Sequence, residues 1–419
     1  MDKNYKNFFS PNGKVIFCWC KDPEEGAVEQ AKLLADQPWV AGHVALMPDT
    51  HQGYGMPIGG IIATNNVIVP NAVGVDIGCG MAAVKTSLTK ISSDELKNIM
   101  TLIRKWVPVG FNKHKAPVDA SLMPSVDHLP LNAISRKQFD DARYQLGTLG
   151  GGNHFIEIQY GSDGYIWFMV HSGSRRLGLD ICNHHKNIAE KLNKLYYSYT
   201  KNLEFLPLDT PEGKAYWDEM QYALAYAQEN RNQMIQKIQK AFKWGHALCK
   251  QCRGKGGDRG KKCSHCNDGI DPGYLDRSVY FDKPINIHHN YAAIENHFGR
   301  NVVVHRKGAT LARAGTIGII PGSQGTQSYI VEGKGSKVAM DSCSHGAGRK
   351  MSRTKAQKTL NLEYEQQRLD KQGILHAIRN TKDLDEAAGA YKDIDIVMAE
   401  QADLVDIKIQ LKPLGVIKG

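Results

Sequence analysis

The sequence predicts an α/β fold in which β-sheets pack against helices around a central cleft, with one small inserted knuckle. Short apolar runs such as residues 167–170 and 302–304 are bounded by turn-forming residues, as strands are. A long stretch over residues 179–244 has the character of helix. Four closely spaced cysteines follow it, so we expect an inserted unit over residues 246–274. The strand order is left open.

The elements follow in order from the same signals. Thr210-Pro211-Glu212 is a helix start, with a cap, a proline at the first helical position and an early acid. The helix that follows carries no recognisable catalytic motif. We expect strands at residues 43–49, 61–63, 67–69, 167–170, 302–304 and 316–320, and helices at 23–36, 93–105, 135–146 and from 211 onward.

Length and composition limit the possible functions. The chain has 419 residues, which allows two or three domains or one large α/β unit. Hydrophobic residues make up 42% and charged residues 23%, as in ordinary globular proteins. A formal net charge of +10 suggests a polyanionic partner such as RNA, DNA or a nucleotide. No apolar run of about 18 residues occurs, so we expect no membrane span and a cytoplasmic location.

Five metal-capable residues stand beside glycine turns or at strand ends. Asp76 and Cys79 lie three apart on a glycine-rich turn, whose freedom could bring a carboxylate and a thiolate to one ion. The alternative is a buried cysteine next to a turn-capping acid. His154, His171 and His289 complete the set. Together they could hold one or two borderline ions such as Mn²⁺ or Zn²⁺.

The stretch from Asp341 to Arg349 is the centre of the functional prediction. His345 is followed by Gly346, Ala347 and Gly348, whose backbone a ligand can approach closely, and then by Arg349, which can grip an anion. A histidine in this setting could attack phosphorus; alternatively, it is an exposed residue beside a glycine turn. With the metal-capable set, the pattern indicates a metal enzyme acting on a phosphate-bearing substrate, with a nucleic acid as our first choice.

The cysteines divide into a cluster and scattered thiols. Cys249, Cys252, Cys263 and Cys266 form two CxxC pairs, which can close a tetrahedral zinc site. The first pair resembles the cysteine-rich repeat of Hsp40-type chaperones, and the second departs from it. The basic loop between the pairs could contact nucleic acid, or the knuckle could be structural only; both readings stay open.

At this point the chain resembles the RtcB family of RNA ligases, from about residue 43 to its end. The motifs that carry the resemblance are Pro-Asp-Thr-His-Gln-Gly-Tyr-Gly, Val-Asp-Ile-Gly-Cys-Gly-Met, Gly-Asn-His-Phe, His-Ser-Gly-Ser-Arg, His-His-Asn-Tyr, His-Arg-Lys-Gly-Ala-Thr, His-Gly-Ala-Gly-Arg and Ile-Lys-Gly. The four-cysteine insertion departs from the family's core pattern, and we expect it to mark a bacterial branch. The resemblance implies a single RtcB-like catalytic domain over residues 1–419.

The resemblance implies a GTP- and Mn²⁺-dependent ligase. It would join RNA ends bearing a 3′-phosphate or 2′,3′-cyclic phosphate to 5′-hydroxyl ends, in RNA repair or tRNA splicing. The reaction would pass through a histidine–GMP intermediate on His345, which Asp49 orients, and an activated RNA-(3′)pp(5′)G end. The need for an activating protein is left open.

The resemblance also implies roles for individual residues. Cys79, His154 and His171 would bind one Mn²⁺, and Asp76, Cys79 and His289 the other. Arg175, Arg349 and Arg353 would contact phosphate or the RNA end. The guanine nucleotide would be held by Asn153, Phe155, Glu157, Asn290, Ser323, Ser328, Ala347, Gly348, Tyr391 and Lys418, with any guanine preference resting on Glu157 and Lys418.

Two other functions stay in view. A metal-dependent phosphoesterase that only opens cyclic phosphates on RNA ends would need no stable adduct on His345. A non-catalytic RNA-binding protein could use the knuckle and the basic surface, but it would leave Asp76, Cys79 and the three histidines unexplained.

Overall fold

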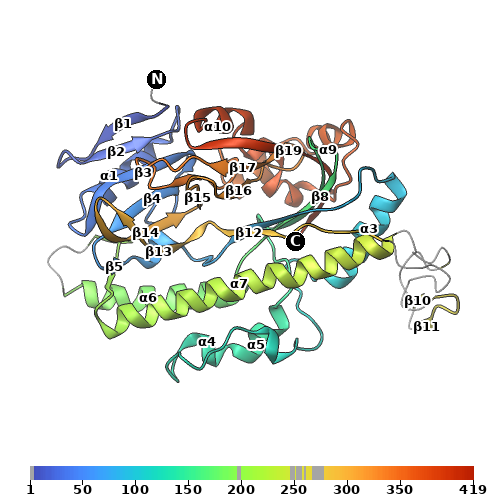
Figure 1. Cartoon of the computed structure of the whole chain (residues 1–419), viewed down its shortest axis with the longest axis horizontal. Coiled ribbons are helices and arrows are strands. Elements are labelled where there is room, and N and C mark those ends of the chain that lie inside the picture. The colour runs from blue at the N-terminus through green and yellow to red at the C-terminus, as the bar shows by residue number, and fades with distance from the viewer. Residues whose placement is uncertain (1–3, 196–199, 246–250, 252–256, 259–260, 267–277) are drawn as a thin grey trace.

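The computed structural model describes residues 4–195, 200–245, 251, 257–258, 261–266 and 278–419. Two large sheets form its upper half, and helices lie beneath and beside them (Figure 1). The first sheet has six strands, in the order β1 (Lys6–Phe9), β2 (Val15–Cys18), β3 (Val40–His51), β4 (Ile58–Thr64), β14 (Arg300–Lys307) and β13 (Asn290–His297). Its β2–β3 pair is parallel.

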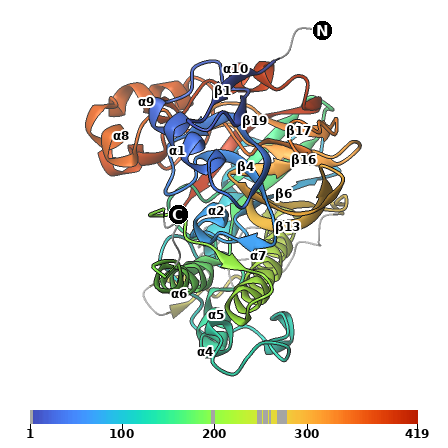
Figure 2. The same ribbon diagram turned by 90° about the vertical axis from the view of Figure 1, so that its left-hand side faces the viewer.

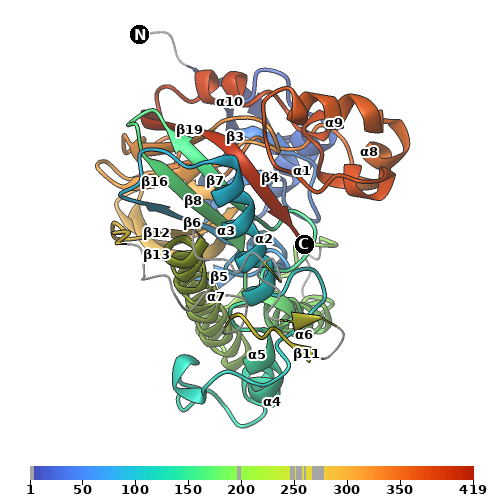
Figure 3. The same ribbon diagram turned by 90° about the vertical axis from the view of Figure 1, so that its right-hand side faces the viewer.

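The second sheet has seven strands and brings the C-terminal strand into its middle. Their order is β12 (Ile285–His288), β6 (Gly80–Lys85), β8 (Ile166–Ser172), β7 (Phe155–Gly161), β19 (Val405–Lys418), β17 (Ser328–Gly333) and β16 (Ile317–Ile320). Figure 3 shows β19 running beside β7. This pairing sets Lys418 opposite Phe155, so the chain's end reaches the start of β7.

The two longest helices lie beneath the sheets, and shorter helices lie around them (Figure 1). The longest is α7 (Pro211–Trp244), which runs beneath the sheets with α6 (Arg175–Asn193) beside it (Figures 1 and 2). The other helices are α1 (Glu25–Ala35), α2 (Pro70–Val73), α3 (Ser93–Trp106), α4 (Ile134–Lys137), α5 (Phe139–Gln145), α8 (Arg353–Thr359), α9 (Leu362–Asp370) and α10 (Ile394–Glu400).

Short elements complete the described chain. The short strands are β5 (Val67–Ile68), β9 (Leu206–Pro207), β10 (Gly257–Asp258), β11 (Lys261–Lys262), β15 (Ala309–Leu311) and β18 (Ser342–Ser344). The 3-10 helices are η1 (Ala120–Leu122), η3 (Thr381–Glu386) and η4 (Ala388–Ala390). No described helix is long and apolar enough to cross a membrane.

One apolar cluster joins the two sheets. Met47 and Val304 from the first sheet pack in it with Ile320 and Val331 from the second. All four side chains are buried, and each contributes roughly 1.5–3 kcal/mol through its removal from water. The two sheets are therefore held face to face, which brings strand ends from both to one place.

A second cluster fixes α7 and α3 on the seven-stranded sheet. Ile99 of α3 and Ile238 of α7 pack there against Val84 and Phe168 of β6 and β8. The cap expected at the start of α7 is present, because the Thr210 side chain accepts a hydrogen bond from the Gly213 N–H. The long helix is thus anchored directly under the strands that carry the candidate site.

Most predicted elements are confirmed, with one clear exception. The single helix expected at residues 135–146 is wrong, because the chain forms α4 and α5 with a break at Gln138. Gln138 lies outside helical geometry, and its side chain donates to Asp180 of α6. This tertiary contact lies beyond the reach of local propensity.

Candidate functional site

The five metal-capable residues meet at one point between the sheets. The Cys79 Sγ lies 3.2 Å from His171 Nε2 and 3.5 Å from His154 Nε2. The Oδ2 atom of Asp76 also belongs to the cluster and lies 3.2 Å from His154 Nε2. The fifth residue, His289, has its Nε2 atom 3.3 Å from His171 Nε2. Strand ends explain this meeting, because Cys79 precedes β6, His171 is the last residue but one of β8, and His289 stands between β12 and β13.

The donor atoms form two triplets that share one sulfur. Asp76, Cys79 and His154 make one group, and Cys79, His171 and His289 make the other, with the donor atoms of each group within 4.8 Å of one another. This grouping differs from the one that the resemblance implied, which put His154 with His171 and Asp76 with His289. Asp76 and His154 lie close together on one side of the Cys79 thiol. His171 and His289 lie close together on its other side.

The protonation states suit metal binding. Burial lowers the pKa values of His171 and His289 well below their ordinary range, so both imidazoles are neutral and offer a lone pair. The His171 Nδ1–H donates to the Asn153 carbonyl at 3.0 Å, which leaves Nε2 free for a ligand. Burial, reinforced by Asp76, raises the pKa of Cys79 well above its usual value, so a cation would be needed to hold the thiolate. The residues therefore fit a divalent ion.

A histidine–aspartate pair lies next to this cluster. The His345 ring centroid is 4.8 Å from that of His289. Its Nδ1 lies 2.6 Å from Asp49 Oδ2, and the same oxygen accepts the His345 backbone N–H at 3.2 Å. Although burial opposes ionisation, His345 holds the pKa of Asp49 below its ordinary value. The buried carboxylate thus fixes the orientation of the His345 ring through Nδ1, and the contact does not involve Nε2.

The turn after His345 requires a glycine at one position. Gly348 has φ +72°, and a side chain there would collide with the backbone carbonyl of Asp49. The turn can therefore lie directly against the end of β3. This close approach keeps His345 beside its aspartate.

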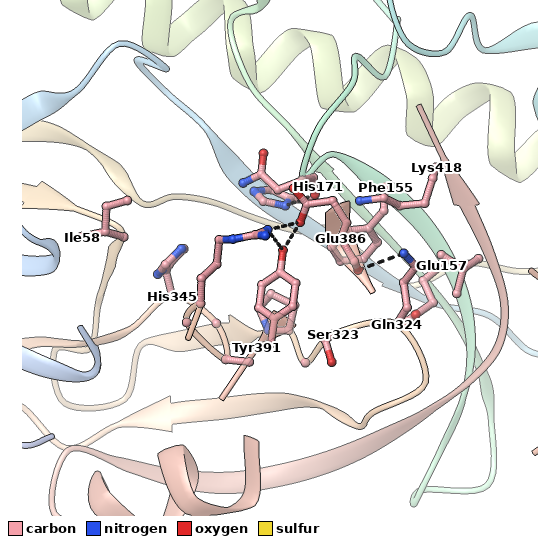
Figure 4. A pocket seen from close by; sticks show the side chains of 18 of the residues that line it. Ile58, Phe155, Glu157, His171, Ser323, Gln324, His345, Glu386, Tyr391 and Lys418 are labelled. Carbon is pink, nitrogen blue, oxygen red and sulfur yellow. Dashed lines mark hydrogen bonds and ion pairs between the residues drawn. The ribbon is translucent and has the colours of Figure 1, made fainter. Parts of the chain in front are cut away.

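A pocket opens from His345 toward the start of β7 (Figure 4). Of the ten residues implied to hold the nucleotide, eight line it: Asn153, Phe155, Glu157, Ser323, Ala347, Gly348, Tyr391 and Lys418. The other two lie outside this lining. The Ser328 hydroxyl accepts from the Gly322 N–H beneath the pocket loop, and the Asn290 side chain joins the Asp76 carbonyl to the Gly308 N–H.

The far end of the pocket holds two groups with shifted pKa values. Burial raises the pKa of Glu157 to about 8, and its carboxylate accepts a hydrogen bond from Gln159. Burial lowers the pKa of Lys418 to about 8, and its ammonium donates to the Gly152 carbonyl at 2.7 Å. Both groups are therefore set to change charge near neutral pH.

Glu386 is a pocket residue that the sequence did not single out. Its buried carboxylate accepts from Arg349 Nη1 at 2.8 Å, from Arg353 Nε at 2.7 Å and from the Tyr391 hydroxyl. Arg349 also donates to the carbonyls of Asp385 and Met351. The anion grip expected of Arg349 is thus directed at protein acceptors in this structure. The only sequence signal is an acidic stretch in η3, which is typical of any solvated turn.

Arg175 lies against the metal-capable cluster at His154. Its Nη1 is 3.4 Å from His154 Nδ1, and its Nε donates to Thr148 Oγ1 at 3.3 Å. Its backbone has φ +59°, a conformation that is unfavourable for a residue with a side chain. The guanidinium lies beside the glycine-rich loop that leads into His154.

The cysteine knuckle is described only in part. Cys263 and Cys266 are half-buried, and Cys249 and Cys252 lie outside the described residues. The expected zinc site therefore stays a prediction.

A shared thiol, a carboxylate and three imidazoles beside an oriented histidine are the donor set of a metal-assisted group-transfer enzyme. Comparison with known proteins specifies the class. The family model described as "tRNA-splicing ligase RtcB" matches residues 30–126, 121–254 and 273–419, so the chain belongs to the RtcB family. The matches leave out residues 255–272, which contain the second cysteine pair.

Curated relatives match nearly the whole chain. The Escherichia coli K12 protein named "RNA-splicing ligase RtcB" is 36% identical, over 99% of this chain and 100% of the relative. "RNA-splicing ligase RtcB1" of another E. coli strain is 35% identical over the same shares. "tRNA-splicing ligase RtcB" of Thermococcus kodakarensis is 30% identical, over 95% of this chain and 92% of the relative.

Proposed function

We propose that this protein is an RNA ligase that joins 3′-phosphate or 2′,3′-cyclic phosphate ends to 5′-hydroxyl ends at the expense of GTP. The observation that carries the proposal is the His345–Asp49 pair standing 4.8 Å, ring to ring, from His289 of the metal-capable cluster. The names of the full-length relatives support splicing or repair of RNA as the setting.

His345 is the proposed nucleophile. Because Asp49 engages Nδ1, the Nε2 lone pair is available to attack the α-phosphorus of GTP. The new N–P bond replaces the bond to the leaving pyrophosphate, and the product is GMP on His345. The RNA 3′-phosphate then takes the GMP from the histidine, and attack by the 5′-hydroxyl on that activated end releases GMP.

The metal cluster would hold two Mn²⁺ ions. Asp76, Cys79 and His154 would hold one ion and Cys79, His171 and His289 the other, because the two donor groups share the Cys79 thiol. The bound ions would offset the triphosphate charge and assist opening of a cyclic phosphate. The choice of manganese rests on the family resemblance, since the donor set also suits zinc.

The pocket beyond His345 would hold the guanine nucleotide. A carboxylate at Glu157 can accept from the guanine N1–H and amino group, and Lys418 can donate to its carbonyl. The Tyr391 ring offers a face for the nucleotide. Arg175, Arg349 and Arg353 would contact phosphate or the RNA end, the last two after exchanging Glu386 for an anionic ligand.

The insertion is proposed as a structural zinc knuckle within a single catalytic domain that spans residues 1–419. Cys249, Cys252, Cys263 and Cys266 would bind the ion through four thiolates. The gap in the family match over residues 255–272 supports an inserted unit, and we propose that it marks a bacterial branch. One equivalent of zinc in the wild type, lost in Cys263→Ser with Cys266→Ser, is the expected metal analysis. We place the protein in the cytoplasm.

The deciding test is covalent labelling with α-³²P-GTP and Mn²⁺, followed by denaturing electrophoresis of the wild type and His345→Ala. Acid-labile label that the wild type retains and the variant loses would support the ligase. A folded wild type that takes no label but opens a 2′,3′-cyclic phosphate would instead support the phosphoesterase. Label without joining of RNA ends would point to a missing activating protein.

A further inference from the structure

We propose that Asn230 and Arg231, neighbours on α7, are positioning residues that hold the metal-ligand loops together and thereby set the affinity for the metal. The inference rests on the metal site of the proposed function. The sequence shows no catalytic motif in this helix, but α7 runs beneath the sheets and packs against the strands that carry the site (Figure 1).

Arg231 is fully buried and reaches three segments of the chain. Its Nη1 donates to the carbonyls of Gly78 at 3.0 Å and Ser172 at 2.8 Å. Its Nε donates to Asn286 Oδ1 at 2.7 Å, and its Nη2 lies 3.2 Å from His288 Nδ1. The fixed fork of a guanidinium can span this many acceptors, and a lysine ammonium cannot.

Three of these partners are sequence neighbours of metal-capable residues. Gly78 precedes Cys79, Ser172 follows His171, and His288 precedes His289. A shift of any of the three segments would therefore carry a ligand with it. Through these neighbours the guanidinium connects Cys79, His171 and His289, although the three residues lie far apart in the sequence.

Asn230 holds the remaining segment. Its Oδ1 accepts from the N–H groups of Gly147 at 2.6 Å and Thr148 at 3.1 Å. Its Nδ2 donates to the Thr148 carbonyl at 3.2 Å, to Ser172 Oγ at 3.1 Å and to the Gly173 carbonyl at 3.0 Å. The glycine loop that leads into His154 is thus tied to the end of β8.

The charge of Arg231 argues against a purely structural role. No ion pair joins it to a carboxylate in the part of the chain that the structure describes, and its direct partners are carbonyl, amide and imidazole groups. Burying a cation in this way is costly, and an apolar side chain of similar volume would stabilise a core at least as well. We therefore attribute the presence of Arg231 to its contacts with the loops that carry the metal-capable residues.

A second buried polar group on α7 offers a matched control. The Glu219 carboxylate accepts from His185 Nε2 at 2.7 Å and from the N–H and hydroxyl of Ser135, at 2.8 and 3.0 Å. Both Glu219 and Asn230 are buried, and each holds several hydrogen bonds from the same helix. These partners of Glu219 lie on α4 and α6, and neither is a metal-capable residue of the cluster or its sequence neighbour.

The test is Mn²⁺ binding by the full chain after removal of metal with a chelator. Free Mn²⁺ is followed by electron paramagnetic resonance as MnCl₂ is added to the wild type, Asn230→Ala, Arg231→Lys and Glu219→Ala, at a temperature where all are folded. We expect the dissociation constant to rise about 10–100-fold in the first two variants, the usual effect of removing a partner that orients a ligand. Glu219→Ala should bind Mn²⁺ like the wild type, although its Tm falls.

Each other outcome overturns the inference. Wild-type affinity in Asn230→Ala and Arg231→Lys would make both residues structural only, and if Arg231→Lys does not fold, Asn230→Ala decides. An equal loss in Glu219→Ala would mean that any loosening of α7 weakens the site. A wild type that binds no Mn²⁺ would refute the proposed metal site itself, a result distinct from the other two.

Discussion

At the scale of single residues, the site contains two buried carboxyl groups whose surroundings shift their pKa values in opposite directions. Asp49 stays ionised beside His345, whereas burial raises the pKa of Glu157 to about 8. The two acids therefore suit different tasks: one orients an imidazole, and the other can accept a proton near neutral pH.

Asp49→Asn tests the first task. An amide keeps the shape of the side chain but can present an N–H to His345 Nδ1, which would favour the tautomer with the proton on the attacking nitrogen. We expect the rate of histidine–GMP formation to fall about 10²–10⁴-fold. The measurement is the rate of labelling with α-³²P-GTP, with Tm as the control for folding. A rate within a few-fold of the wild type would contradict the orienting role.

Glu157→Gln tests the second task through pH dependence. Because the folded pKa is raised from 4.5 to about 8, the folded protein binds the proton more tightly than the unfolded chain does. This contribution to stability is complete below the unfolded pKa and is lost as pH rises to about 8, with a slope of at most about 1.4 kcal/mol per pH unit. The difference in the free energy of unfolding, wild type minus variant, should fall between pH 5 and 8 in urea titrations. A constant difference would mean that Glu157 has an ordinary pKa.

At the scale of elements, the turn between β18 and α8 joins His345 to the pocket proposed for the nucleotide. Its backbone presses against the end of β3, and the following residues carry Arg349 and Arg353 to Glu386. The turn therefore has to keep a conformation that only glycine adopts readily at position 348.

Gly348→Ala, with Gly373→Ala as its control, tests the turn. Both glycines have left-handed backbones, φ +72° and +70°, but only at Gly348 does an added methyl group meet other atoms. We expect each variant to lose about 1–3 kcal/mol from backbone strain. Only Gly348→Ala should also lose histidine labelling, because the collision with Asp49 separates the pair. Equal labelling of the two variants would show that the close approach is dispensable.

At the scale of the whole molecule, the net charge of +10 suits an RNA partner. The pocket proposed for the nucleotide holds Arg349, Arg353 and Lys418 against the carboxyl groups of Glu157 and Glu386. Cations in excess of acids near the site should bind phosphates and release counterions, which makes the affinity depend on salt.

The salt dependence of RNA binding gives a measure of this contribution. Each neutralised phosphate of a single strand contributes about −0.7 to the slope of log K against log salt, so four contacts would weaken binding about 50-fold between 50 and 200 mM. Fluorescence anisotropy with a labelled 3′-phosphate RNA measures the slope. A flat response would mean that uncharged contacts hold the strand.

Much of the architecture and the chemistry could be read from the sequence. The strand and helix positions followed from apolar runs and caps, because these signals are local. The residues of the candidate site stood in short glycine-bounded motifs, since a ligand-binding backbone needs glycine and metal ligands need particular side chains. The split of residues 135–146 into α4 and α5 was missed, because the contact that Gln138 makes with α6 at the break is not visible in the local sequence.

What the sequence by itself determined is the set of reactive groups and the family to which they belong. Only the tertiary structure decided which groups meet. It put Asp76 with His154 and His171 with His289, brought Glu386 to the two arginines, and placed Asn230 and Arg231 under the ligand loops. These partners are separated by tens to hundreds of residues. Their meeting depends on how two sheets and a long helix pack, and that packing is a property of the whole buried surface rather than of any one segment.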